Sequence, residues 1–584
     1  MKLVFCNTNR LARRIVAVAV AVSSLMAMRI EAAPSKDGGI DYGISQVQAI
    51  NQHIRKGWQE NDLVASPPAT DAEWCRRVYL DVLGRVPDIR ELSEFVASRE
   101  ANKKDKLVSK LLYDEKYTEE YARNWTTLWT VVLIGRSGGT EQNSLTNREG
   151  MQKYLRDSFA RNKPYHEMVQ ELVTATGSNL PGSEAFNGAV NFLAMKVNDE
   201  NGTLATSSTA RIFLGLQVQC TQCHNHPFND WKQEKFWEFN SFFRQTRAQA
   251  KYLPGTRDVQ SSELINRDFT GEGQDPKKAE IYYELRNGLL KVAYPVFVDG
   301  TTIPTSGYVS EVNRRAELGK LILKSEYMDK SVVNRYWAHF LGYGFTKPVD
   351  DLGPHNPASH PEFLDLLGKE VRNYNYNLKE LIRWITLSEA YSLSSKIVSG
   401  KKKGDGNEKD DPLQGETPRF SHFYLRQMRA EELYHSLLTA TNAASARGSY
   451  EEQERAKQAW LSQFVLAFGN DEGEEATTFN GTIPQALMMF NGDLIQKAIG
   501  VEKGGFLWEL ANNAKLKPQQ KIEQLFLAAL ARKPTRDELR AAEVLFEVHA
   551  KDKSVKGDIS KASLAAVQDI WWAVLNSNEF IINH

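Results

Sequence analysis

The residues with the clearest chemistry lie at 220–224, where two cysteines and a histidine follow the pattern Cys-x-x-Cys-His. This is the attachment pattern of c-type haem. The two thiols reach the two vinyl groups of the porphyrin, and the adjacent imidazole binds the iron from one face. We therefore expect Cys220, Cys223 and His224 to hold one haem c, for electron transfer or for a redox step.

Other chemistry fits the same residues. The motif together with His226 offers two thiolates and two imidazoles, which are suitable ligands for zinc or iron. Four ligands within seven residues would strain a tetrahedral geometry, so at least one ligand would come from elsewhere. A redox dithiol is a further alternative, although no βαβ pattern surrounds the motif, and a buried structural pair is the last. A zinc or iron site would indicate an exported metal-dependent enzyme or a polymer-binding protein, and a non-catalytic envelope scaffold is the third functional class.

A second group of polar residues occupies a short, proline-rich segment. Its carboxylates and imidazoles could bind a metal or act as acid and base; they are Asp350, Asp351, His355, His360 and Glu362. The structural alternative is a rigid loop in which Ser359 caps a helix that begins at Pro361, with Glu362 in its first turn. We favour the structural alternative.

A haem iron also needs a ligand on its other face, usually histidine or methionine. The sequence does not select among the candidates Met195, His166, His339 and His360.

Several aromatic residues follow the motif and could line a haem pocket, but their helical spacing favours an ordinary hydrophobic core. They are Phe228, Trp231, Phe236, Trp237, Phe239, Phe242 and Phe243.

The N-terminus has the composition of an export signal. Basic residues precede an apolar run at 15–28, and small residues follow at 32–33. The run is shorter than the roughly 20 residues that span a bilayer, although an uncleaved anchor is the alternative. We expect 1–33 to be a signal peptide and the protein to be periplasmic or associated with the cell envelope. No later segment is long and apolar enough to span a membrane.

The charge balance of the chain gives no support for nucleic-acid binding. The 584 residues contain 73 Lys and Arg and 73 Asp and Glu, so the chain lacks the basic excess that nucleic-acid binding favours. A redox partner protein is the expected macromolecular contact, and the sequence does not indicate an oligomeric state.

Outside the signal and the motif the one remaining cysteine is Cys75, which lies on an apolar helical stripe and is expected to be a buried structural thiol.

Apolar spacing predicts a mainly α protein of two helical domains with a small β-containing or irregular insert between them. The predicted N-terminal domain covers 41–245, the insert 246–310 and the C-terminal domain 311–584, with a charged surface loop at 399–417. Helices are expected at 71–83, 88–99, 105–113, 117–133, 151–160, 164–175, 205–223, 230–244, 311–325, 329–342, 361–374, 377–391, 427–441, 451–468, 483–499, 518–532, 536–551 and 561–576.

Two distant segments, 80–92 and 527–539, share one pattern. Each has an apolar helix, then Arg-x-Pro, then Asp or Thr three residues before Glu. The last spacing predicts a capping box, in which the first side chain and the glutamate satisfy each other's free amides. Each copy is therefore expected to be a helix, a turn and a capped helix.

These motifs resemble a planctomycete cytochrome-associated family. Residues 76–81, 84–87 and 213–231 resemble its domain of unknown function 1549, and residues 333–342, 359–365, 483–487 and 575–580 resemble its partner, domain of unknown function 1553. The resemblance covers nearly all of the chain after the signal, in the expected order. It implies an exported, cytochrome-like protein with the Cys-x-x-Cys-His in its usual place, and it implies neither a reaction nor catalytic residues.

Overall fold

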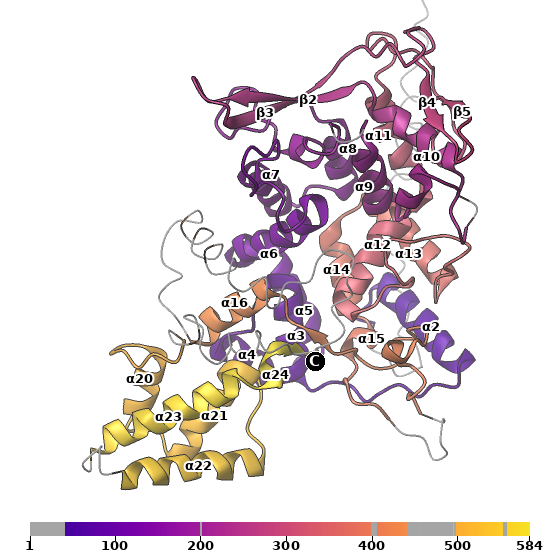
Figure 1. Ribbon diagram of the computed structural model, residues 1–584. Helices are drawn as coiled ribbons and strands as arrows, with labels where there is room; N and C mark the ends of the chain where they lie inside the picture. Colours follow the sequence, from indigo (N-terminus) through magenta and orange to yellow (C-terminus); the bar gives the residue numbers. More distant parts are fainter. Residues whose placement is uncertain are drawn as a thin grey trace, which may run out of the picture.

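The computed structural model describes residues 41–198, 201–229, 231–398, 406–441, 498–552 and 558–584, with a few isolated positions between 442 and 497. Helices dominate this part of the chain and the strands are short (Figure 1), so the fold is mainly α, as predicted. The expected signal at 1–33 and most of the helices expected at 451–468 and 483–499 lie outside the described residues. Within the described ranges, none of the helices combines the length and the apolar character that crossing a bilayer requires.

The helices that precede the long strands follow the predicted pattern closely up to residue 175. One addition is α2, whose Val47, Ile50 and Ile54 are buried at helical spacing. The helices are α2 (Ser45–Glu60), α3 (Asp71–Leu83), α4 (Ile89–Ala97), α5 (Lys103–Tyr113), α6 (Glu115–Ile134), α7 (Arg148–Ala160), α8 (Tyr165–Thr174), α9 (Thr203–Leu214) and α10 (Gln233–Asn240), with 3₁₀ turns η1 (Gly188–Phe192), η2 (Gln219–Gln222) and η3 (Ser241–Phe243).

Two antiparallel hairpins lie within 246–310, at one end of the molecule in Figure 1. The first pairs β2 (Thr246–Tyr252) with β3 (Val259–Asn266), and β1 (Gly177–Ser178) joins it along β3, giving the order β1-β3-β2. The second pairs β4 (Ile281–Glu284) with β5 (Leu290–Ala293). Beyond these hairpins, Val296 makes an isolated antiparallel bridge to Thr302.

The helices after the hairpins pack against the N-terminal helices in one large core. This second set comprises α11 (Arg314–Lys324), α12 (Glu326–Leu341), α13 (Pro361–Asn373), α14 (Leu378–Thr386) and α15 (Glu389–Ser392). Trp125 of α6 stacks on Tyr336 of α12 with ring centroids 4.8 Å apart and an interplanar angle of 5°. The larger core thus contains side chains from both sides of the hairpins, and the predicted division into two domains stays a prediction.

A smaller core holds the C-terminal helices together. They are α16 (Ala430–Ala440), α20 (Phe506–Asn512), α21 (Pro518–Leu530), α22 (Arg536–Lys551), α23 (Ile559–Leu575) and α24 (Asn578–Ile581), with the 3₁₀ turn η4 (Pro412–Gln414) before them and the strand pair β6 (Arg426–Gln427) and β7 (Ile582–Asn583). Leu80 and Val86, from α3 and the turn after it, also belong to this core. In Figure 1, α20 to α23 project from the body on the side away from the hairpins.

The repeated sequence pattern forms the same structure twice. Asp88 and Glu91 form the predicted capping box at the start of α4, and Thr535 and Glu538 form the second one at the start of α22. Both predictions are confirmed, because in each case the side chain and the backbone N–H of the two residues bond reciprocally.

Each capping glutamate also binds the arginine of the pattern. Arg85 donates to Glu91 at 2.8 Å and contacts Glu120 of α6, whereas Arg532 donates to Glu538 at 2.8 Å and contacts Glu579 of α24. In both copies the arginine therefore joins its own capped helix to a helix that is distant in sequence.

Two arginines of the 76–81 motif, Arg76 and Arg77, contact segments from the C-terminal half of the chain. Arg76 donates to the backbone carbonyls of Phe580 at 2.8 Å and Ile582 at 2.9 Å. Arg77 donates to the carbonyl of Leu393 at 2.9 Å, and its guanidinium lies over the Phe423 ring at 3.5 Å. The motif thus holds the last strand and the loop after α15 against α3.

Asp81, at the end of the same motif, is completely buried. Its carboxylate pairs with Arg426 of β6 and accepts hydrogen bonds from the Tyr391 hydroxyl at 2.6 Å and the Asn583 amide at 2.8 Å. One side chain of α3 is therefore the common partner of α15, β6 and β7.

Candidate functional site

The Cys-x-x-Cys-His motif does not end a long helix. The expected helix at 205–223 is wrong in its second half, because α9 stops at Leu214, where Gly215 takes a left-handed conformation with φ 66°. The Gly215 N–H still bonds to the Ala210 carbonyl, which closes the helix end. The chain then makes a separate short turn, η2, that carries the motif.

Both thiols of the motif are exposed and make no disulfide. Cys220 lies within η2 and Cys223 directly follows it, with a helical backbone conformation at φ −106° and ψ −24°. A 3₁₀ turn has three residues per turn, so side chains three positions apart lie above one another. This spacing favours presentation of the two thiols on the same side of the turn.

Side chains from α10 hold this turn in place. The Gln222 carbonyl accepts hydrogen bonds from the side chains of Gln233 and Trp237, each at 3.1 Å. The Asn225 side chain accepts the Gln233 backbone N–H at 3.0 Å, and Thr221 is buried beneath the turn. The thiols are thereby fixed relative to α10 although they are exposed themselves.

The two histidines of the segment use their ring nitrogens differently. His224 Nδ1 lies 2.7 Å from its neighbour's backbone carbonyl, that of Asn225, and must donate to it. The lone pair of the neutral ring is then on Nε2. His226 Nδ1 instead accepts the Phe228 backbone N–H at 3.2 Å, which leaves the proton of its neutral ring on Nε2. Only His224 is therefore arranged to offer Nε2 as a ligand.

The loop that carries the second predicted cluster docks beside the motif. Asp350 is buried and pairs with Arg211 of α9 at 3.2 Å, and it accepts a hydrogen bond from the Gln217 side chain at 2.8 Å. The Leu352 N–H donates to the Gly215 carbonyl at 2.7 Å. A Cβ at Gly215 would lie 2.8 Å from the Leu352 side chain, so glycine is needed for this close approach as well as for its backbone conformation.

This docking brings residues of the two predicted clusters together. His355 Nε2 lies 3.0 Å from an Asp351 carboxylate oxygen, and the His355 ring centroid is 5.8 Å from that of His226. Partial burial lowers the pKa of His226 from its ordinary value, the neighbouring His355 lowers it further, and Asp351 opposes the shift. Asp351, His355 and His226 therefore form one polar group next to the motif.

The other two residues of the second cluster lie apart from it. His360 is buried against the Phe345 and Phe420 rings, and Glu362 pairs with Lys56 of α2 at 3.3 Å. The expectation that Ser359 caps α13 is wrong. His360 is the N-cap residue, and the Ser359 hydroxyl bonds the His360 ring at 3.0 Å.

The residues around the motif divide into core and surface. Phe236, Phe239, Phe242 and Phe243 are buried, as helix core is expected to be, whereas Phe228 is 82% exposed. Cys75 of α3 is fully buried, which confirms the predicted burial, and this burial raises the pKa of its thiol well above the ordinary value.

The candidates for a second iron ligand have other partners. His339 is buried, with Nε2 3.1 Å from the Asp81 carbonyl, and the ring of His166 packs on Tyr376. The sulfur of Met195, which is half exposed, lies 3.2 Å from the Leu145 N–H.

Across the described residues, no group of three or more His, Cys, Asp or Glu side chains has the spacing to hold a metal ion. Sequence reasoning missed Arg211 and Gln217, which position the Asp350 loop, and Gln233, which positions the turn. It named Trp237 only as an aromatic residue of the pocket wall or core, and not as a hydrogen-bond donor to the turn. Gln217 lies inside the 213–231 motif, so its place in that motif was the available signal, but its partner could not be read from the sequence.

The fold and site define a mainly helical protein with an exposed Cys-x-x-Cys-His turn. The loop that carries Asp350 and His355, from later in the chain, lies beside this turn. The family model described as protein of unknown function DUF1549 matches residues 49–248, and the model described as protein of unknown function DUF1553 matches residues 314–546. The chain belongs to the family in which these two domains follow one another. No curated protein and no solved structure matches it.

Proposed function

We propose that this protein is an exported, cytochrome-like protein that binds one haem c through Cys220, Cys223 and His224 and serves electron transfer or a redox step. The observation that carries the proposal is the arrangement of the motif. Two exposed thiols lie three positions apart at a short 3₁₀ turn, and an imidazole with a free Nε2 lone pair follows directly.

The donor set fits a covalently attached haem. Free, exposed thiols can each add across one vinyl group, with sulfur joining one carbon and hydrogen the other. His224 donates from Nδ1 to a backbone carbonyl, which is the usual way in which a protein sets the tautomer and orientation of a metal-binding imidazole. When bound, haem would supply one-electron redox chemistry at this site.

The arrangement of His226 favours haem over a zinc or iron site built from both imidazoles. Its Nδ1 accepts a backbone N–H, so binding a metal through Nε2 would first require the loss of that hydrogen bond. Its position beside His355 and Asp351 instead suits a polar group at the edge of the haem site.

Export is part of the proposal, since the N-terminal basic and apolar segments resemble a secretory signal and c-type haem is attached outside the cytoplasm. The balanced charge of the chain gives no support for a nucleic-acid partner. A redox partner protein is the macromolecular contact that the haem proposal itself requires.

The test is expression of the full chain, with its signal, in a host that attaches haem c, followed by mass spectrometry, visible absorption and metal analysis. His224→Ala should abolish the normal spectrum, whereas the matched His226→Ala should keep covalent haem. A zinc or iron site built from both imidazoles would respond differently, because the two substitutions would then weaken metal binding by similar amounts. Parent protein that carries metal but no haem would refute the proposal.

A further inference from the structure

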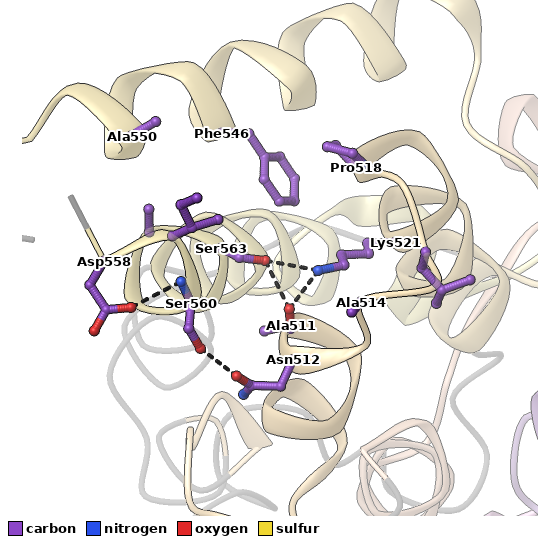
Figure 2. A pocket seen from close by; sticks show the side chains of 13 residues that line it. Ala511, Asn512, Ala514, Pro518, Lys521, Phe546, Ala550, Asp558, Ser560 and Ser563 are labelled. Atoms are coloured by element: carbon purple, nitrogen blue, oxygen red, sulfur yellow. Dashed lines mark hydrogen bonds between the residues drawn. The ribbon is translucent and has the colours of Figure 1, made fainter.

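A pocket of about 500 Å³ lies among α20, α21, α22 and α23, and Figure 2 shows it. Its volume is within the roughly 300–1,000 Å³ of typical ligand sites. Most of its lining is apolar, including Leu516, Pro518, Phe546 and Ala562. Figure 1 places these helices far from α9 and α10, which flank the Cys-x-x-Cys-His turn, so the pocket is separate from the proposed haem site.

One charged side chain lies at the base of this apolar pocket. Lys521 of α21 is only 8% exposed, and its ammonium donates to the Ala511 carbonyl at the end of α20 and to the Ser563 hydroxyl at 3.1 Å. In Figure 2 these three groups form a triangle, toward which Phe546 projects from α22. An ammonium has three N–H donors, so one remains for another partner.

Within the part of the chain that the structure describes, the charge of Lys521 has no counter-ion. Among the described residues it makes no ion pair, its two partners are neutral, and burial lowers the pKa of its amine. The acidic residue of the lining, Asp558, lies at the other end of the pocket in Figure 2. There its carboxylate caps α23 and lies 3.7 Å from the Lys561 ammonium. A buried cation without an anion is unfavourable, so an anion bound beside Lys521 would be stabilised.

We propose that this pocket binds a free aliphatic carboxylate, whose head group takes the remaining donor of Lys521 and whose chain lies against the apolar lining. The hydrogen bonds favour binding over hydrolysis at Ser563. Lys521 donates to the Ser563 hydroxyl, and that hydroxyl donates to the Ala511 carbonyl at 3.1 Å, so the lysine is not placed to remove a proton from the serine.

The test is isothermal titration calorimetry of the full chain with octanoate and with octan-1-ol, a neutral match for the chain length. The parent should bind octanoate at least about tenfold more tightly than the alcohol, because a hydrogen bond between ionised groups is stronger than a neutral one. Lys521→Met should remove this preference. The control Lys551→Met, which removes an equal charge from a side chain that is 82% exposed on α22, should keep it.

A second variant fills the pocket without disturbing the core. Ala550 is exposed yet lines the pocket, so Ala550→Trp should weaken binding of both ligands by about tenfold or more. Equal affinity of the parent for octanoate and octan-1-ol, or a preference that survives Lys521→Met, would overturn the proposal. If Lys521→Met does not fold, the comparison of the two ligands on the parent and the Ala550→Trp result decide the question.

Discussion

Replacing Asp81 by asparagine should destabilise the protein more than most single substitutions, because this carboxylate joins three distant segments to α3. It is fully buried, pairs with Arg426, and accepts hydrogen bonds from Tyr391 and Asn583. An asparagine has almost the same shape, but it lacks the charge and turns an amide donor toward one of these three donors.

The expected decrease in the free energy of unfolding comes mainly from Arg426, the ion-pair partner that remains buried. Arg426 is only 6% exposed, so Asp81→Asn removes the carboxylate that pairs directly with this buried guanidinium, while the nearby charge of Glu432 remains. Removing one partner of a buried ion pair costs about 3–5 kcal/mol. The hydrogen bond that the amide cannot accept adds about 1 kcal/mol, so we expect a loss near the upper end of that range.

Urea unfolding, followed by tryptophan fluorescence, measures this decrease in the free energy of unfolding. It should appear as a shift of the earliest unfolding transition to lower urea concentration. The control is Asp365→Asn, whose carboxylate is 50% exposed and pairs with Lys330 at 2.9 Å; it should cost about 0.5 kcal/mol or less. Adding Arg426→Met to Asp81→Asn should recover part of the loss, because the unpaired charge is then gone. A loss below about 1 kcal/mol for Asp81→Asn would refute the assignment of Asp81 as the joint between these segments.

Two further outcomes follow from exposure. In protein made without haem attachment, iodoacetamide should label Cys220 and Cys223 in the native state and Cys75 only after unfolding. The reason is that burial hides the Cys75 thiol and raises its pKa. Mass spectrometry counts the labels, and labelling of Cys75 in the native protein would contradict the structure. Brief trypsin treatment should cut first after Arg257, in the exposed turn between β2 and β3. Of the predicted surface loop 399–417, the described part contains the buried Asn407 and Asp410, so it should be cut more slowly. Initial cleavage within 205–244 would show that the boundaries are misplaced.

Local patterns in the sequence were enough for much of the fold. Helix positions follow from apolar spacing, because a helix buries one stripe of side chains wherever it packs. The capping boxes at Asp88 and Thr535 follow from residues three positions apart, and the burial of Cys75 follows from its helical neighbours. The end of α9 was missed because the apolar run continues past Gly215, whose backbone conformation is set partly by its contact with Leu352.

The chemistry of the motif was evident from residue type and spacing alone, since Cys220, Cys223 and His224 are close in sequence. Which histidine has a free Nε2 was not, because that depends on backbone groups placed by the turn. The contact of His226 with His355 joins residues more than a hundred positions apart, and it exists because Asp350 docks on Arg211 and Gln217. Long-range partners of this kind are selected by packing and charge in the folded chain, so only the tertiary structure could decide them.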